Sequence, residues 1–155
     1  MPGLNVVLLA PEIAGNTGNI IRLCANTGSR LHLIEPITFQ LDDARLRRAG
    51  LDYHEYADVH VHQSLSACLD SLGQPRVFAF SARATRSFAE PHYTSGDAFL
   101  FGPESSGLPD DVVARFTDDR LVTIPMRPQT RSLNLSNAVA VAVYEGLRQL
   151  DYPLT

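Results

Sequence analysis

The chain has 155 residues, of which 45% are hydrophobic and 19% charged, and its formal net charge is −4. This length and composition are typical of one soluble domain, which we expect to span residues 1–155. The two cysteines exclude a disulfide framework. No apolar run is long enough to cross a membrane, so we expect a cytoplasmic protein.

All 13 basic residues are arginine, and the sequence contains no lysine. This composition excludes a Schiff-base enzyme and a Walker-type phosphate loop, because both need a lysine. It does not exclude phosphate recognition, since a guanidinium group binds phosphate through two parallel hydrogen bonds. The acidic net charge argues against a partner that is held by bulk electrostatics alone.

Short apolar runs alternate with helix-like segments along the whole chain. In chain order we expect a strand at residues 4–10, a helix at 16–26, a strand at 31–35, a helix at 42–49, a strand at 58–62, a helix at 64–72, strands at 76–81 and 98–101, a helix at 109–116, a strand at 121–124 and a helix at 135–150. This alternation predicts an α/β fold with a mostly parallel sheet and helices on both faces. Ligands bind such sheets at the carboxyl ends of the strands.

The final helix contains the run AVAVAV at residues 138–143, which is apolar on every side. A helix without a polar face is buried all round. In a short chain, either a partner subunit or the centre of the chain's own sheet can cover such a helix. We favour the partner subunit, and therefore a homodimer.

The segment PEIAGNTGNIIR, residues 11–22, leads into the first predicted helix. The free N–H groups at a helix start, together with Arg22, attract phosphate or another anion. Capping of the helix by Asn16 or Thr17 is the alternative interpretation.

The segment FGPESSGLP, residues 101–109, follows a predicted strand, and its glycines allow a ligand to approach the backbone closely. No single serine is centred between glycines as in the nucleophile turn of serine hydrolases. The alternative is a tight turn with two polar serines.

The segment IPMRPQTRSLNLSN, residues 124–137, brings arginine, hydroxyl and amide groups to the start of the last helix. An exposed loop followed by a capped helix is the alternative. Elsewhere, His60 and His62 share one strand face as metal ligands can, but no third ligand is evident, so we expect a surface pair and no metal. Cys24 is expected in the core.

Together the three segments resemble the three motifs of the SPOUT methyltransferases. NTGNIIR, FGPESSGLP and IPM followed by SLNLSNA match in order, spacing and strand context over the whole chain. The sequence RLRRAGLDYHEY, residues 45–56, is similar to the subgroup that methylates the ribose 2′-hydroxyl of the wobble nucleotide of tRNA, cytidine or modified uridine. Where that family usually has two prolines before NTGN, this chain has Ala14 and Gly15.

The resemblance implies a deep trefoil knot near the C-terminus, a homodimer, and S-adenosylmethionine as the methyl donor, with S-adenosylhomocysteine as product and no metal. By matching position, the cofactor would be bound by Phe80, Gly102, Ile124, Met126, Ser132 and Leu133. The family's proposed base corresponds to Arg22, with Ser132 and Tyr144 as supporting groups. Because free arginine is essentially always protonated, the positioning of phosphate and hydroxyl is the simpler role for Arg22. Asn16 and Glu104 are expected to shape the site.

Binding of tRNA by an acidic chain requires a local basic patch, because phosphate affinity depends on nearby positive charge. We expect Arg45, Arg48, Arg127 and Arg131 to contribute to such a patch, with Arg47, Arg83 and Arg86 as further candidates, if they converge across the dimer. Three alternatives stay open: methylation of a different tRNA or rRNA ribose, a non-catalytic RNA-binding dimer that keeps the knot, and an unrelated α/β nucleotide-binding protein such as a hydrolase. The absence of lysine and of the relevant glycine signatures argues against the last of these.

Overall fold

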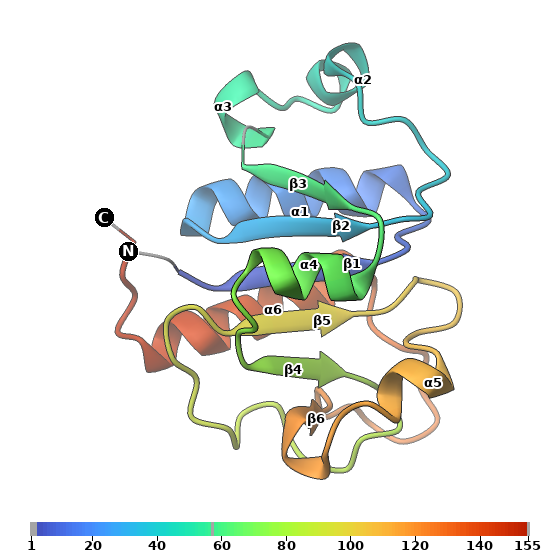
Figure 1. Ribbon diagram of the computed structural model, residues 1–155, viewed down its shortest axis with the longest axis vertical. Coiled ribbons are helices and arrows are strands. Elements are labelled where there is room, and N and C mark those ends of the chain that lie inside the picture. Colours follow the sequence, from blue (N-terminus) through green and yellow to red (C-terminus); the bar gives the residue numbers. More distant parts are fainter. Residues whose placement is uncertain (1–2, 57, 155) are drawn as a thin grey trace.

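The computed structural model describes residues 3–56 and 58–154, and within these ranges six parallel strands form one sheet. The strands lie in the order β3-β2-β1-β5-β4-β6 (Figure 1). Their bounds are β1 Asn5–Leu9, β2 Arg30–Ile34, β3 Val59–His62, β4 Val77–Phe80, β5 Ala98–Phe101 and β6 Leu121–Val122. Every predicted strand is present, and the predicted α/β fold with a parallel sheet is confirmed.

The helices also follow the predicted order. Their bounds are α1 Ala14–Thr27, α2 Asp43–Arg48, α3 Tyr53–Tyr56, α4 Leu65–Ser71, α5 Asp110–Val113, the 3-10 turn η1 Asp118–Arg120 and α6 Leu135–Gln149. No sequence signal marks α3 or η1, because a single turn is too short to show a hydrophobic period. In the described part of the chain, no helix is both long and apolar enough to cross a membrane.

Helices cover both faces of the sheet, as predicted. On one face, α1 and α6 pack against alternate strand residues such as Val6, Leu33 and Phe99. On the other face, α4 and α5 pack against the intervening residues, among them Val7 and Leu100. In Figure 1, α4 and α5 lie in front of the sheet, and α1 and α6 lie behind it. The strands are apolar on both sides because both sides are buried.

The final helix, α6, packs closely on the centre of the sheet. A Cβ atom at Gly146 would lie 2.6 Å from Leu4 Cδ1 and 3.1 Å from Phe99 Cζ, so a larger residue would require these side chains to shift. The α6 residues buried against the sheet are Val139, Ala142, Val143, Gly146 and Leu147. Val141 and Tyr144 are each 44% exposed. The chain's own sheet therefore covers one side of α6 and leaves apolar surface on another.

The segments that carry the sequence motifs meet at one edge of the sheet. Because the strands are parallel, the loops after β1, β4, β5 and β6 leave the sheet on the side toward which the arrows of Figure 1 point. Residues 123–134 then lead from β6, at the end of the sheet, back to α6. The knot implied by the resemblance stays a prediction, and this return path is consistent with it.

Candidate active site

A cavity of about 420 Å³ lies at the carboxyl ends of β4 and β5, between the loops that follow β4, β5 and β6. Its volume is within the usual range for a small-molecule or cofactor site. Its lining includes all six residues that the resemblance assigns to the cofactor, namely Phe80, Gly102, Ile124, Met126, Ser132 and Leu133. The second and third motif segments and the loop after β4 therefore border one cavity.

The loop after β5 folds back on itself and forms one wall of this cavity. A Cβ atom at Gly102 would lie 2.2 Å from both the carbonyl carbon of Gly107 and the backbone nitrogen of Leu108, which leaves no room for a side chain. Gly107 has a φ of 68°, in the left-handed region that favours glycine. Its N–H donates a hydrogen bond of 2.8 Å to the carbonyl oxygen of Pro103. The two glycines thus make the compact turn possible.

Glu104 joins this loop to the segment before α1. Its carboxylate accepts hydrogen bonds from the backbone N–H groups of Glu12 and Ile13, each at 2.8 Å. It also accepts a hydrogen bond of 3.2 Å from Nδ2 of Asn16. The side chain predicted to shape the site therefore connects two motifs that are about 90 residues apart in sequence.

The start of α1 differs from the capping interpretation. The helix begins at Ala14, two residues earlier than expected, and its N-cap residue Ile13 makes no capping side-chain bond. Capping by Asn16 or Thr17 is therefore wrong, because both residues lie inside the helix. The negative charge that a helix start favours is supplied by the chain itself, through the Glu104 carboxylate on the N–H of Ile13.

Two further contacts complete the link between the motifs. The Glu12 carboxylate accepts hydrogen bonds of 2.8 Å from both the backbone N–H and the hydroxyl of Ser105, and these bonds lower the pKa of the Glu12 carboxyl. Asn134, the N-cap of α6, donates from Nδ2 to Oδ1 of Asn16 at 3.0 Å. All three motif segments are therefore joined by side-chain hydrogen bonds beside the cavity.

Arg22 lies on α1 and contacts the segment that contains α2 and α3. Its guanidinium forms an ion pair with the Glu55 carboxylate and donates a hydrogen bond to the carbonyl oxygen of Gly50. The Arg22 side chain is 47% exposed, whereas the Glu55 side chain is 13% exposed. The largely buried Glu55 carboxylate thus holds the Arg22 guanidinium in place, while part of the guanidinium stays exposed to solvent.

The three predicted catalytic residues occupy different places in the single chain. Ser132 lines the cavity, whereas the described lining residues do not include Arg22 or Tyr144. Tyr144 is on α6 and is 44% exposed. A single copy of the chain does not bring Arg22 and Tyr144 to the cavity that Ser132 lines. One site that contains all three residues therefore requires groups from outside this copy.

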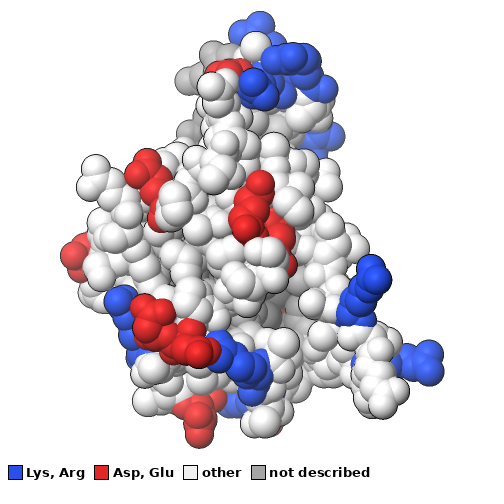
Figure 2. Space-filling model, turned by 90° about the vertical axis from the view of Figure 1, so that its right-hand side faces the viewer, with Lys and Arg blue, Asp and Glu red and all other residues white. Residues whose placement is uncertain are grey.

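Basic side chains occupy separate parts of the carboxyl edge of the sheet. Figure 2 views this edge and shows basic side chains over α2 at the top, further basic side chains in the lower half, and acidic side chains between them. The four predicted RNA-binding arginines are all exposed. Arg45 and Arg48 are on α2, and Arg127 and Arg131 are in the loop before α6. On this face a single chain does not present one continuous basic patch.

The sequence alone did not reveal Glu12 and Glu55 as site residues. Glu12 lies beside the first motif, and its partner Ser105 is 93 residues away. Glu55 lies within the sequence RLRRAGLDYHEY, next to Arg22 in space but far from it in the chain. The position of these carboxylates next to the sequence motifs was the one indication of a role in the site. Their partners, Ser105 and Arg22, are identified only by the fold.

Comparisons with known proteins agree on the kind of protein that carries this arrangement. A model of the SpoU rRNA Methylase family matches residues 3–144. A tRNA (cytidine(34)-2′-O)-methyltransferase of Burkholderia ambifaria is 55% identical over 150 residues, which cover 96% of each chain. The enzyme of the same name from Escherichia coli K12 is 53% identical over 150 residues, covering 97% of this chain and 96% of its own.

A solved structure is similar to this chain in both sequence and fold. It concerns the 2-OH methylation of C/U34 on tRNA, and its chain is 49% identical to this one. The two superpose with a TM-score of 0.87 over 97% of each chain. The cavity, the three joined motifs and the whole sheet therefore fall within the matched region.

Proposed function

Because the chain belongs to the SpoU rRNA Methylase family, we propose that it transfers a methyl group from S-adenosylmethionine to the ribose 2′-hydroxyl of nucleotide 34 of tRNA. The observation that carries the proposal is a cavity lined by the second and third motif segments, to which the first motif segment is joined by side-chain hydrogen bonds. Relatives that are 53–55% identical over nearly the whole chain and are named for cytidine 34 favour this nucleotide over another tRNA or rRNA ribose.

The residues around the cavity fit S-adenosylmethionine. Apolar side chains of Phe80, Ile124 and Leu133 suit an adenine ring, and Gly102 lines the same cavity. Ser132 adds a hydroxyl group at the same cavity. When bound, the cofactor supplies a sulfonium methyl group that is already activated for transfer.

The protein's contribution to the reaction is positioning and proton removal. Methyl transfer would require the ribose 2′-oxygen to be aligned with the donated methyl group and its proton to pass to a base. A guanidinium is a poor base, so we assign Arg22 the role of orienting an RNA phosphate and the attacking hydroxyl. The ion pair with Glu55 holds the guanidinium for this role. Ser132 is the supporting group that lies at the cavity.

We propose that the active form is a homodimer. Its support is the apolar surface that α6 leaves exposed at Val141 and Tyr144, and the exposed Met126 and Leu133 at the cavity. A second copy that covers this surface brings its own Arg22 and basic side chains toward the cavity. The same assembly joins the arginines of α2 with Arg127 and Arg131, as phosphate binding requires. With tRNA as substrate, the protein acts in the cytoplasm.

The proposal is tested with an anticodon stem-loop RNA and labelled S-adenosylmethionine. We expect label to enter the RNA with ribose at nucleotide 34, and no label to enter the same RNA with 2′-deoxyribose at that nucleotide. Arg22→Ala is expected to reduce transfer while cofactor binding stays intact, because Arg22 is not among the described cavity-lining residues. Equal transfer to the ribose and deoxyribose substrates would refute the assignment of the acceptor.

Cofactor binding is measured separately through thermal unfolding with S-adenosylhomocysteine. A ligand present at about 100 times its dissociation constant stabilises the native protein by about 2.7 kcal/mol. Absence of any stabilisation at saturating concentrations would contradict the assignment of the cavity.

A further inference from the structure

A second cluster of ligand-type side chains lies on the face of the sheet that α4 covers. Three residues each offer one ligand atom, and these atoms all lie within 4.8 Å of one another. They are a ring nitrogen of His32, a ring nitrogen of His62 and the Sγ of Cys68. None of these three residues lines the cavity at the carboxyl edge. We propose that His32, His62 and Cys68 bind one transition-metal ion of the zinc class, a site independent of the methyl-transfer reaction.

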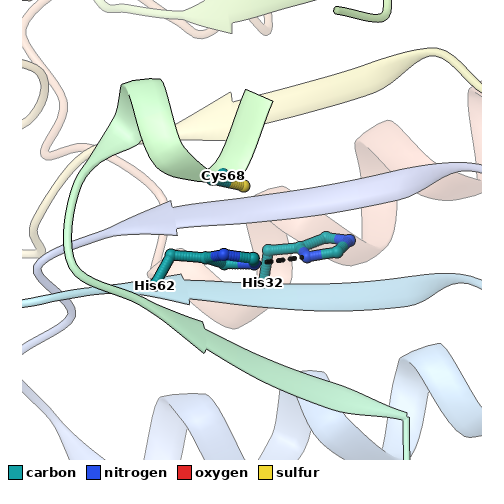
Figure 3. A group of neighbouring side chains, drawn as sticks. All are labelled: His32, His62 and Cys68. Carbon is teal, nitrogen blue, oxygen red and sulfur yellow. Dashed lines mark hydrogen bonds between the residues drawn. The ribbon is translucent and has the colours of Figure 1, made fainter. Parts of the chain in front are cut away.

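The parallel register of two strands brings the histidines together. His32 on β2 is paired with His60 on β3, so His60 and His62, two residues apart, lie on the same face of the sheet as His32. Cys68 comes from α4, which packs over this face. Figure 3 shows the Cys68 side chain on the side of α4 that faces the two imidazole rings. Three different elements therefore contribute one ligand each.

Hydrogen bonds from the second layer fix the orientation of His32. Asn5 Nδ2 donates to the carbonyl oxygen of Gly96 at 3.1 Å, so its Oδ1 is the atom that faces His32 Nε2, at 3.2 Å. An amide oxygen only accepts, so Nε2 of His32 carries the proton. The lone pair of His32 is therefore on Nδ1, which lies 3.0 Å from His62 Nε2. A buried acceptor that orients a histidine in this way is the usual second layer of a metal site.

The donor set suits a borderline-soft cation. Two imidazole nitrogens and one thiolate are ligands that zinc binds tetrahedrally, and three protein ligands leave the fourth position to water. Bonds of about 2.0–2.3 Å to zinc place neighbouring ligand atoms about 3.3–3.7 Å apart. Binding therefore requires the two ring nitrogens, now 3.0 Å apart, to separate slightly, and any pair near the 4.8 Å limit to approach. Binding converts the Cys68 thiol to a thiolate and releases its proton to solvent.

The surroundings of the cluster are mostly dry but keep one side accessible. Cys68 is fully buried and His32 is 3% exposed, whereas His62 is half-buried and offers a route from solvent. His60 stacks on His32 but its Nε2 bonds to Asp58 Oδ1 at 2.9 Å, so it does not join the ligand group.

A bound ion would fasten the end of the sheet. β3 is the terminal strand, paired only with β2, and α4 follows it directly in the chain. One ion held by His32, His62 and Cys68 links β2, β3 and α4 at a single point. We therefore expect metal binding to raise the unfolding temperature without changing the methyl-transfer rate.

The test uses the full-length protein, treated with a chelator and then titrated with Co²⁺ as the spectroscopic probe. We expect a near-ultraviolet absorption from thiolate-to-cobalt charge transfer that saturates at one ion per chain and disappears when Zn²⁺ is added. Cys68→Ser removes this absorption, and His62→Ala weakens cobalt binding by about tenfold or more. Circular dichroism without metal establishes that each variant is folded.

Two matched variants separate this site from incidental binding. Cys24→Ser removes the other free thiol, which packs on the opposite face of the sheet, and keeps the absorption. His60→Ala removes the adjacent exposed histidine and keeps the affinity. No absorption with the folded wild-type protein, or unchanged binding in folded His62→Ala or Cys68→Ser, would overturn the proposal.

Discussion

Glu12 and Glu104 bind each other's loops reciprocally. The Glu104 carboxylate accepts the backbone N–H of Glu12, and the Glu12 carboxylate accepts the backbone N–H of Ser105, the residue after Glu104. Each bond is 2.8 Å long. Two carboxylates, each satisfied by N–H groups of the other loop, hold the first and second motifs together beside the cavity without a direct contact between the like charges.

The first prediction concerns the stability that Glu104 provides. Glu104→Gln replaces one carboxylate oxygen with an NH2 group that cannot accept, so only one of the N–H groups of Glu12 and Ile13 keeps its acceptor. We expect a decrease of about 1–3 kcal/mol in the free energy of unfolding, measured by denaturant titration. Glu35→Gln, which alters an exposed carboxylate, is the control and should leave the value unchanged. Equal stability of the Glu104 variant and the control would contradict the structural role of Glu104.

The second prediction concerns the pH dependence of the same contact. Hydrogen bonds from Ser105 lower the pKa of the folded Glu12 carboxyl below its usual 4.5. As the pH falls toward 4.5, the unfolded state therefore binds more protons than the folded state. The stabilisation by Glu12 is lost as the pH falls further, through the lowered pKa of the folded carboxyl. A Glu12→Gln variant should show a shallower loss of stability than the wild type between neutral and acidic pH. Parallel stability curves would be inconsistent with this coupling.

The third prediction concerns the turn that forms the cavity wall. A methyl group at position 102 meets the backbone of Gly107 and Leu108 at 2.2 Å, so Gly102→Ala forces the loop to move. We expect a loss of about 2 kcal/mol or more in stability together with loss of S-adenosylhomocysteine binding. Gly15→Ala is the matched control, because its Cβ meets nothing within 4 Å and alanine favours a helix. Normal ligand binding by Gly102→Ala would show that the wall is not needed.

The fourth prediction concerns Glu55 as a residue that positions Arg22. Glu55→Gln removes the charge that fixes the guanidinium, so we expect kcat for methyl transfer to fall by about tenfold or more. KM for S-adenosylmethionine should stay unchanged, because Glu55 is not among the described cavity-lining residues. Asp52→Asn, a change at a nearby exposed carboxylate, serves as the control. A change in KM alone would assign Glu55 to cofactor binding instead.

Much of the fold was predictable because strands and helices each carry their own local pattern. The apolar runs around Val6 and Phe99 and the glycine after α1 are sufficient to place their elements. The strand order was not predictable from such patterns, since it depends on which segments pack together. For the same reason the third member of the histidine group escaped notice: His32 meets His62 only through the parallel register of β2 and β3.

The candidate site was predictable to the extent that the family resemblance assigns its residues. Phe80, Gly102 and Ser132 were expected to meet, and they line one cavity. The residues that contact these motifs were not predictable. Glu55, for example, reaches Arg22 only through the packing of α3 on α1. Sequence spacing identifies chemical groups that recur together, whereas their hydrogen-bond partners follow from the three-dimensional arrangement.

The most direct measurement maps the methylated nucleotide after the purified protein has been incubated with unmodified tRNA and S-adenosylmethionine. Nuclease digestion followed by mass spectrometry locates the added methyl group. A single 2′-O-methylated ribose at nucleotide 34 is the expected result. Methylation of a base or of a ribose elsewhere, or binding of both substrates without any transfer, would contradict the proposed activity.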